Sequence, residues 1–109
     1  MPYGAINRGG FKILPETVRR VLISHPAVRD ACVVGVPDKR LGQVPFAAIE
    51  ATPGMQVPSS DELKGLVRQA LPVFNVPVDF VVVDELPRNP ALKVSLPAVA
   101  ALYEARANR

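Results

Sequence analysis

The chain has 109 residues, 49% of them hydrophobic and 21% charged, which is the size and balance of one folded domain rather than of a disordered chain. One cysteine and one histidine exclude an internal disulfide and are too few for a metal centre, so we expect no bound metal. The net charge of +3 raises nucleic acid as a partner, but the basic residues are spread out and the aromatic residues are not interleaved with them, so we expect no nucleic acid partner.

The first third of the chain predicts a turn, a short strand and a helix. Gly9-Gly10 forms the turn, and residues 11–14 follow as a short strand. Pro15 and Glu16 then have the composition of a helix start, and apolar residues recur at helical spacing until Pro26.

The middle of the chain predicts a β-hairpin. In a valine-rich strand that begins near residue 27, Val28, Asp30, Cys32 and Val34 are expected on one side of the pleat. Residues 38–43 form a polar turn, and residues 44–52 form the second strand, so the two strands are expected to be joined by a long loop.

The last half of the chain predicts a helix, a strand and a final helix. Ser59 and Glu62 have the spacing of a capping box at the start of a helix over residues 59–71. Residues 78–87 form a strand too continuously apolar to be an exposed edge, and Pro97 begins the final helix. We therefore expect an α+β domain, with a small antiparallel or mixed sheet of about three strands and helices packed on it.

One lysine stands in an unusual setting near the end of the chain. Lys93 lies in the segment PRNPALKVSLP, which Pro87, Pro90 and Pro97 make stiff. A lysine that only improves solubility does not need this setting.

Several short motifs occur in a fixed order along the chain. A Gly-Gly pair precedes a Pro-Glu helix start, and HPAV, VVGVPD, LG, VP and DELPR then follow before the lysine. From about Ile6 to Val94, the chain thereby resembles the C-terminal domain of AMP-forming acyl-CoA synthetases, in the adenylate-forming ligase superfamily.

The resemblance implies one part of a two-domain enzyme. In that family, an N-terminal adenylation domain binds ATP, with its Mg²⁺, and a carboxylic acid such as a fatty acid. The small C-terminal domain is a mobile lid. The acid is first adenylated with release of pyrophosphate, and coenzyme A then displaces AMP to give the thioester. The implied partners are thus the adenylation domain, ATP or AMP, and coenzyme A, none of them tightly bound to this chain, and the isolated chain is expected to be inactive.

The resemblance also implies roles for four residues. Lys93 matches the family's adenylation lysine, whose charge stabilises the transition state when a carboxylate attacks the α-phosphate. Gly9 and Gly10 match a glycine pair along the channel for coenzyme A, and Lys12 matches a residue that contacts the AMP phosphate. Residues 1–10 would be the hinge-proximal segment with the Gly-Gly turn, and residues 11–109 the lid domain.

Two departures from the family pattern leave a second interpretation open. Ala91-Leu92 replaces the usual Ser-Gly before the lysine. Because a positive φ is energetically unfavourable for leucine, the loop is expected to adopt a different conformation from that of the family. The charged hinge residue expected near residues 2–5 is also absent. The alternative is a stand-alone binding or regulatory module with the same fold and no activity of its own.

The sequence also predicts the cellular compartment. No apolar run reaches the roughly 20 residues of a membrane span, and no charged segment followed by an apolar stretch opens the chain. Together with the single unpaired Cys32, this predicts a cytoplasmic protein.

Overall fold

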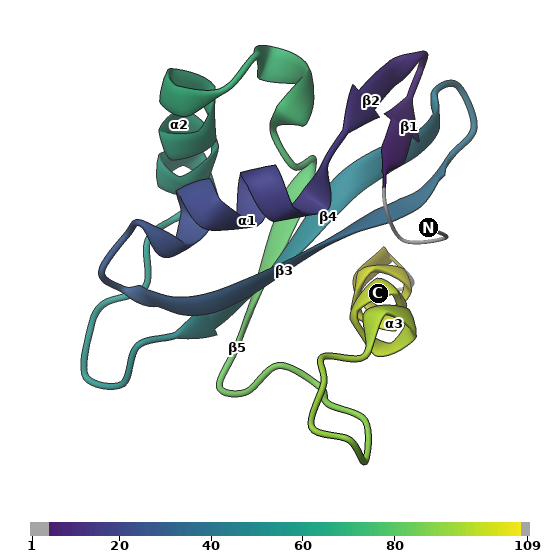
Figure 1. Cartoon of the computed structure of the whole chain (residues 1–109). Helices are drawn as coiled ribbons and strands as arrows, with labels where there is room; N and C mark the ends of the chain where they lie inside the picture. The colour runs from purple at the N-terminus through teal and green to yellow at the C-terminus, as the bar shows by residue number, and fades with distance from the viewer. Residues whose placement is uncertain (1–4, 108–109) are drawn as a thin grey trace.

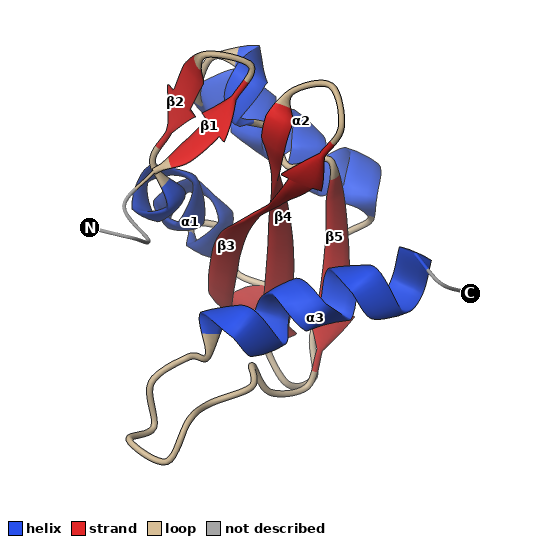
Figure 2. Cartoon of the chain, turned by 90° about the vertical axis from the view of Figure 1, so that its right-hand side faces the viewer, coloured by secondary structure: helices blue, strands red, loops and turns tan. Residues whose placement is uncertain are grey.

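The computed structural model describes residues 5–107, which fold into three layers (Figure 1). A sheet forms the middle layer. Helices α1 (Pro15–Ile23) and α2 (Ser60–Ala70) cover one face, and α3 (Leu96–Ala107) crosses the other, as Figure 2 shows. The α+β prediction is therefore confirmed.

The sheet has five strands rather than about three, because residues around the Gly-Gly turn also pair. The strands are β1 (Ile6–Arg8), β2 (Phe11–Ile13), β3 (Val28–Asp38), β4 (Gly42–Ala51) and β5 (Asp79–Val83), and a short 3-10 helix, η1 (Val73–Asn75), precedes the last of them. Their order is β2-β1-β4-β3, and β5 pairs with β4. The β4–β5 pair is parallel and the other pairs are antiparallel, so the sheet is mixed.

The hairpin of β3 and β4 is tighter than predicted. Asp38 pairs with Gly42, so only residues 39–41 form the turn, and the long loop is wrong. The Asp38 carboxylate closes this turn, because its Oδ2 accepts hydrogen bonds from the backbone N–H groups of Arg40 (3.1 Å) and Leu41 (2.8 Å). An aspartate that bonds to its own following backbone is a common turn device.

A β-bulge in β3 changes which side chains share a face. Val28 pairs with Ala51 but Asp30 pairs with Glu50, so Arg29 is an extra residue on this strand. The bulge shifts the alternation by one position, and Val28 therefore packs under α1 and α2 whereas Cys32 and Val34 pack under α3. The prediction that these three side chains lie on one side is wrong for Val28.

Two apolar clusters, one on each face of the sheet, hold the layers together. The first includes Val18 and Leu22 of α1 and Leu63 and Val67 of α2. The second packs Val99 of α3 against the opposite face of β3 and β4. Burial of these side chains stabilises the chain by roughly 1.5–3 kcal/mol each.

Strand β5 lies at an edge of the sheet, contrary to the prediction. Within residues 5–107 it pairs only with β4, and Val82 is 43% exposed. Its apolar run is explained by contacts on both faces: Phe80 belongs to the first cluster, and Val81 and Val83 pack against the second.

The helix starts follow the sequence signals. Pro15 occupies the first turn of α1. The Ser59 hydroxyl caps α2 by accepting a hydrogen bond from the Glu62 N–H at 3.1 Å. Helix α3 begins at Leu96, with Pro97 in its first turn, where no intrahelical N–H is needed.

Candidate functional site

Lys93 lies in the loop between β5 and α3, which projects away from the three layers in both views (Figures 1 and 2). Its side chain is exposed, and among the described residues its ammonium has no ion-pair partner. The charge is therefore free to meet an anion supplied from outside the domain.

The Lys93 loop is a closed hairpin and not a flexible connection. Arg88 pairs with Val94 at its base. Asn89 then donates its backbone N–H to the Lys93 carbonyl at 2.8 Å, and Leu92 donates to the Asn89 carbonyl at 2.8 Å. This pattern is a type I turn followed by a left-handed residue, a common three-residue hairpin loop.

The Asn89 side chain holds the inside of this hairpin. Its Oδ1 accepts hydrogen bonds from the backbone N–H groups of Ala91 (2.9 Å) and Lys93 (3.2 Å). With Asn89 before the turn and Pro90 at its first corner, the sequence suits a type I turn. The backbone of Lys93 is thus fixed through both its N–H and its carbonyl.

Leu92 adopts the left-handed conformation that this loop requires, at φ 65°. Leucine therefore does adopt the positive φ that is expected to be unfavourable here, and the hydrogen bonds of Asn89 and Lys93 close the turn around it. The Leu92 side chain is also 77% exposed. This residue therefore carries backbone strain without compensating burial within the domain.

The base of the hairpin is anchored to the sheet by a buried carboxylate. Glu50 in β4 is only 4% exposed, and its Oε1 accepts the backbone N–H of Leu86 at 2.8 Å. Its Oε2 accepts a hydrogen bond from Arg29 Nε at 2.9 Å. On the other side of the hairpin base, Ser95 donates its N–H to the Pro87 carbonyl at 2.8 Å.

Arg19 and Arg29 both form ion pairs near the base of the hairpin, with Asp30 of β3 and Glu50 of β4. Arg19 donates to Asp30 Oδ1 from Nε (3.1 Å) and Nη2 (2.9 Å), and the hydrogen bond to Asp30 raises the pKa of its guanidinium. Arg88 extends the group, with its Nη2 3.8 Å from both Asp30 and Glu50. Sequence reasoning missed this cluster, although one carboxylate inside an apolar strand is a signal for a buried ion pair.

The Gly-Gly turn joins β1 to β2. Gly9 has φ 56° and Gly10 has φ 95°, the combination that a two-residue hairpin turn needs. Gly9 also donates its N–H to the Leu41 carbonyl at 2.7 Å, and a Cβ at Gly9 would come within 2.8 Å of a Leu41 methyl group. Within residues 5–107, and apart from its two chain neighbours, no heavy atom lies within 4 Å of a Cβ built on Gly10, so this side of its backbone is open.

Lys12 is exposed on β2 and pairs with Asn7 across the same hairpin. The hairpin is fixed onto η1 by two contacts. Phe11 stacks on Phe74 with 4.7 Å between ring centroids, and Arg8 Nη1 donates to the Phe74 carbonyl at 3.0 Å. Gly9, Gly10 and Lys12 are therefore brought together on one rigid hairpin.

The four predicted site residues do not form one site. The β1–β2 hairpin lies at one end of the domain and the Lys93 loop lies at the other, in both Figure 1 and Figure 2. The two ends cannot face the same bound molecule at the same time unless the molecule spans the domain.

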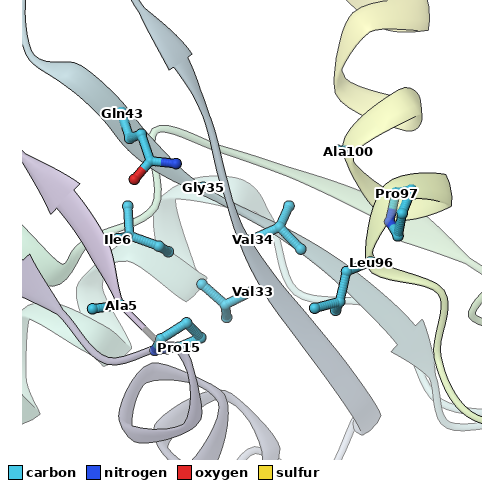
Figure 3. A pocket seen from close by; sticks show the side chains of 10 residues that line it. All are labelled: Ala5, Ile6, Pro15, Val33, Val34, Gly35, Gln43, Leu96, Pro97 and Ala100. Atoms are coloured by element: carbon cyan, nitrogen blue, oxygen red, sulfur yellow. The ribbon is translucent and has the colours of Figure 1, made fainter. Parts of the chain in front are cut away.

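Three pockets in the described part of the chain are lined by none of these four residues. A pocket of about 250 Å³ lies between the start of α3 and β3 (Figure 3). Gln43 is the one polar side chain among its lining residues, and its Oε1 is engaged by the Asn7 N–H at 3.1 Å. Within residues 5–107, no group of three acidic, histidine or cysteine side chains could hold a metal ion, and no helix is long and apolar enough to cross a membrane.

Sequence comparisons match this chain to one family model and to relatives named as CoA ligases. The family model for the "AMP-binding enzyme C-terminal domain" matches residues 18–93. The chain is 49% identical over 89 residues to a medium/long-chain-fatty-acid–CoA/3-oxocholest-4-en-26-oate–CoA ligase of Mycobacterium marinum, covering 82% of this chain and 16% of the ligase. It is 39% identical over 105 residues to a probable 2-succinylbenzoate–CoA ligase of Mycobacterium tuberculosis, covering 96% of this chain and 27% of the relative.

Solved structures agree with these sequence matches. The fold resembles part of the amide bond synthetase McbA from Marinactinospora thermotolerans, with a TM-score of 0.87 and 33% identity, covering 93% of this chain and 20% of that one. It also resembles part of the o-succinylbenzoate CoA synthetase from Bacillus subtilis, with a TM-score of 0.82 and 35% identity, covering 91% and 20% of the two chains. The 109 residues thus span about a quarter or less of the length of these relatives.

Proposed function

The chain belongs to the family of AMP-binding enzyme C-terminal domains, and on that premise we propose that it acts as the mobile lid of an ATP-dependent, AMP-forming acid–CoA ligase. Its partner is an N-terminal adenylation domain that binds ATP with Mg²⁺ and the carboxylic acid, and coenzyme A is the acceptor. The named relatives act on fatty acids and 2-succinylbenzoate, so a carboxylic acid is the substrate class. The 109 residues alone are expected to be inactive, because the other domain holds ATP and the acid.

The observation that carries this proposal is the exposed ammonium of Lys93 on a closed, projecting hairpin. Attack of a carboxylate on the α-phosphate of ATP brings two anions together, and a positive charge aimed at the reacting oxygens stabilises the transition state. A hydrogen-bonded hairpin fixes the backbone of Lys93 relative to the domain, and the side chain extends the ammonium outward from that point.

The opposite end of the domain supports the second half of the reaction. We infer that the backbone of Gly9 and Gly10 lines the path of the pantetheine arm of coenzyme A, because open space lies beside Gly10. Lys12 stands on the same hairpin, and would therefore reach a nucleotide phosphate only when this end faces the reaction centre.

The separation of the two ends explains why the lid must move. Lys93 serves adenylation and the Gly-Gly turn serves thioester formation, so one end has to leave the reaction centre before the other arrives. Rotation of a rigid domain between two orientations achieves this without refolding. The stand-alone alternative rests on Ala91-Leu92 and on the hinge segment near residues 2–5, most of which lies outside the described residues; at the first of these, Leu92 adopts a positive φ.

The test joins the chain to an adenylation domain of this family and measures the two half-reactions separately. Lys93→Ala is expected to lower the rate of acyl-adenylate formation about 10²- to 10³-fold, the usual effect of removing a group that stabilises transition-state charge. Thioester formation from a supplied acyl-adenylate should persist. Lys64→Ala, which removes a lysine from α2, is the control and should leave both rates unchanged. Equal losses in both half-reactions for Lys93→Ala would show that its assigned role is wrong.

A further inference from the structure

We propose that Arg88 is a positioning residue for Lys93, and that it sets the orientation of the Lys93 hairpin by linking it to Asp30 and Glu50 of the sheet. This inference rests on the proposed function, because it matters for the reaction only if Lys93 acts in adenylation. The geometry on which it depends lies entirely within the domain.

The Arg88 guanidinium makes contacts in two directions. Toward the hairpin, its Nη1 donates to the carbonyl of Leu92, the residue before Lys93, at 3.3 Å. Toward the sheet, its Nη2 lies 3.8 Å from Asp30 Oδ2 and 3.8 Å from Glu50 Oε1. One planar group therefore links the tip of the hairpin to strands β3 and β4, which a lysine with a single ammonium would do less well.

The two carboxylates are suitable anchors because other arginines hold them in place. Asp30 Oδ1 is engaged by Arg19 and by the Ala31 N–H, and Glu50 Oε2 is engaged by Arg29. Asp30 thus turns its second oxygen toward Arg88, and Glu50 Oε1, which also accepts the Leu86 N–H, lies at the same 3.8 Å from Arg88. Glu50 is also buried, so its position is set by the strand and not by solvent.

The hairpin tilts against the sheet as one unit, so contacts at its base, including those of Arg88, determine where its tip lies. Hydrogen bonds of Asn89 fix the backbone of Lys93 within the hairpin, and the longer contact of Arg88 with the Leu92 carbonyl adds to them. The tilt of the hairpin against the sheet depends on its base, where the contacts are the Leu86–Glu50 and Ser95–Pro87 hydrogen bonds and the Arg88 ion pairs. A change of tilt would displace the ammonium at the tip, and a displacement of about 1 Å can cost a reaction up to 10²-fold.

The first test measures hydrogen exchange by NMR in the 109-residue chain, which contains both core clusters. Arg88→Gln is expected to speed exchange of the Leu86 and Ser95 amides at the hairpin base about tenfold, the effect of losing a charged hydrogen bond on local opening. Arg88→Lys should give an intermediate rate. Arg106→Gln is the matched control, because Arg106 is also ion-paired and half-exposed but joins α3 to Asp79 of β5.

The second test uses the chain joined to an adenylation domain. Arg88→Gln should lower kcat for acyl-adenylate formation about tenfold with KM for ATP unchanged, since orientation and not binding is lost. Thioester formation from supplied acyl-adenylate should stay within about twofold of wild type, and Arg88→Lys should recover part of the adenylation rate. A merely structural role would instead lower both half-reactions together.

The outcomes separate this inference from the proposed function. If Lys93→Ala leaves adenylation intact, the proposed function fails whatever Arg88 does. If Lys93→Ala abolishes adenylation while Arg88→Gln changes neither the amide exchange rates nor kcat, only the positioning role is overturned. Equal loss of both half-reactions in Arg88→Gln, with faster exchange throughout the domain, also overturns it.

Discussion

Leu92 shows how one residue can carry a cost that its surroundings impose. Its φ of 65° lies in the left-handed region, where a Cβ costs about 1–2 kcal/mol, and its exposed side chain regains nothing by burial within the domain. The neighbouring Asn89 supplies hydrogen bonds that keep the turn closed all the same. Removing the Cβ should therefore relieve strain without opening the hairpin.

Leu92→Gly is accordingly expected to raise the free energy of unfolding by about 0.5–1 kcal/mol, because relief of strain exceeds the extra entropy of glycine in the unfolded chain. Urea unfolding of the 109-residue chain measures this change. Ala91→Gly is the matched control: φ at Ala91 is not positive, so glycine there should lower stability slightly. A loss of stability in Leu92→Gly as large as that in Ala91→Gly would contradict the strain argument.

Cys32 makes stability depend on pH in the alkaline range. Burial raises the pKa of its thiol to about 11 from an ordinary 9.0, with a smaller contribution from the charge of Asp30. The unfolded chain thus releases this proton at lower pH than the folded chain does. The stabilisation is complete below the ordinary pKa and is lost as pH rises through the folded value.

The expected result is a pH-dependent difference between wild type and Cys32→Ala. The free energy of unfolding of wild type should fall relative to the variant by about 1 kcal/mol per pH unit between pH 9 and 11, and the difference should be constant near neutral pH. Chemical unfolding of both proteins across this range measures it. Parallel curves from neutral pH to pH 11 would show that the thiol does not resist ionisation.

At the scale of elements, the features that the sequence predicts correctly are those determined by neighbouring residues. The start of α2 at Ser59, the place of Pro97 in α3 and the Gly9-Gly10 turn were all predictable, because caps and turns are local. The face on which Val28 packs was not predictable. It depends on the bulge at Arg29, which forms only when β3 meets β4.

The same distinction applies to the candidate site. Lys93 stands out in the sequence because prolines surround it and because it ends a run of family motifs. The anchoring of its hairpin does not stand out, because Glu50 and Leu86 are 36 residues apart and meet only when β4 is buried in the middle of the sheet. Charged groups joined across such distances are visible only in the fold.

At the scale of the whole molecule, the domain carries the Gly9-Gly10 turn at one end and the Lys93 ammonium at the other. The two apolar clusters hold the layers together, and the β1–β2 hairpin and the Lys93 loop lie at opposite ends of them. Effects of substitutions at the two ends should therefore be independent in free energy. If the proposed function is correct, each end also governs its own half-reaction.

The glycines allow this independence to be tested. In the ligase formed with an adenylation domain, Gly10→Ala strains the turn at φ 95° and should slow thioester formation about tenfold while adenylation stays within twofold of wild type. Gly54→Ala is the matched control, since Gly54 has φ 80° and equally open surroundings but lies in the loop between β4 and α2. Combined with Lys93→Ala, Gly10→Ala should add its own loss to thioester formation and none to adenylation. A Gly10→Ala variant that slows both half-reactions equally would mean that the two ends do not act separately.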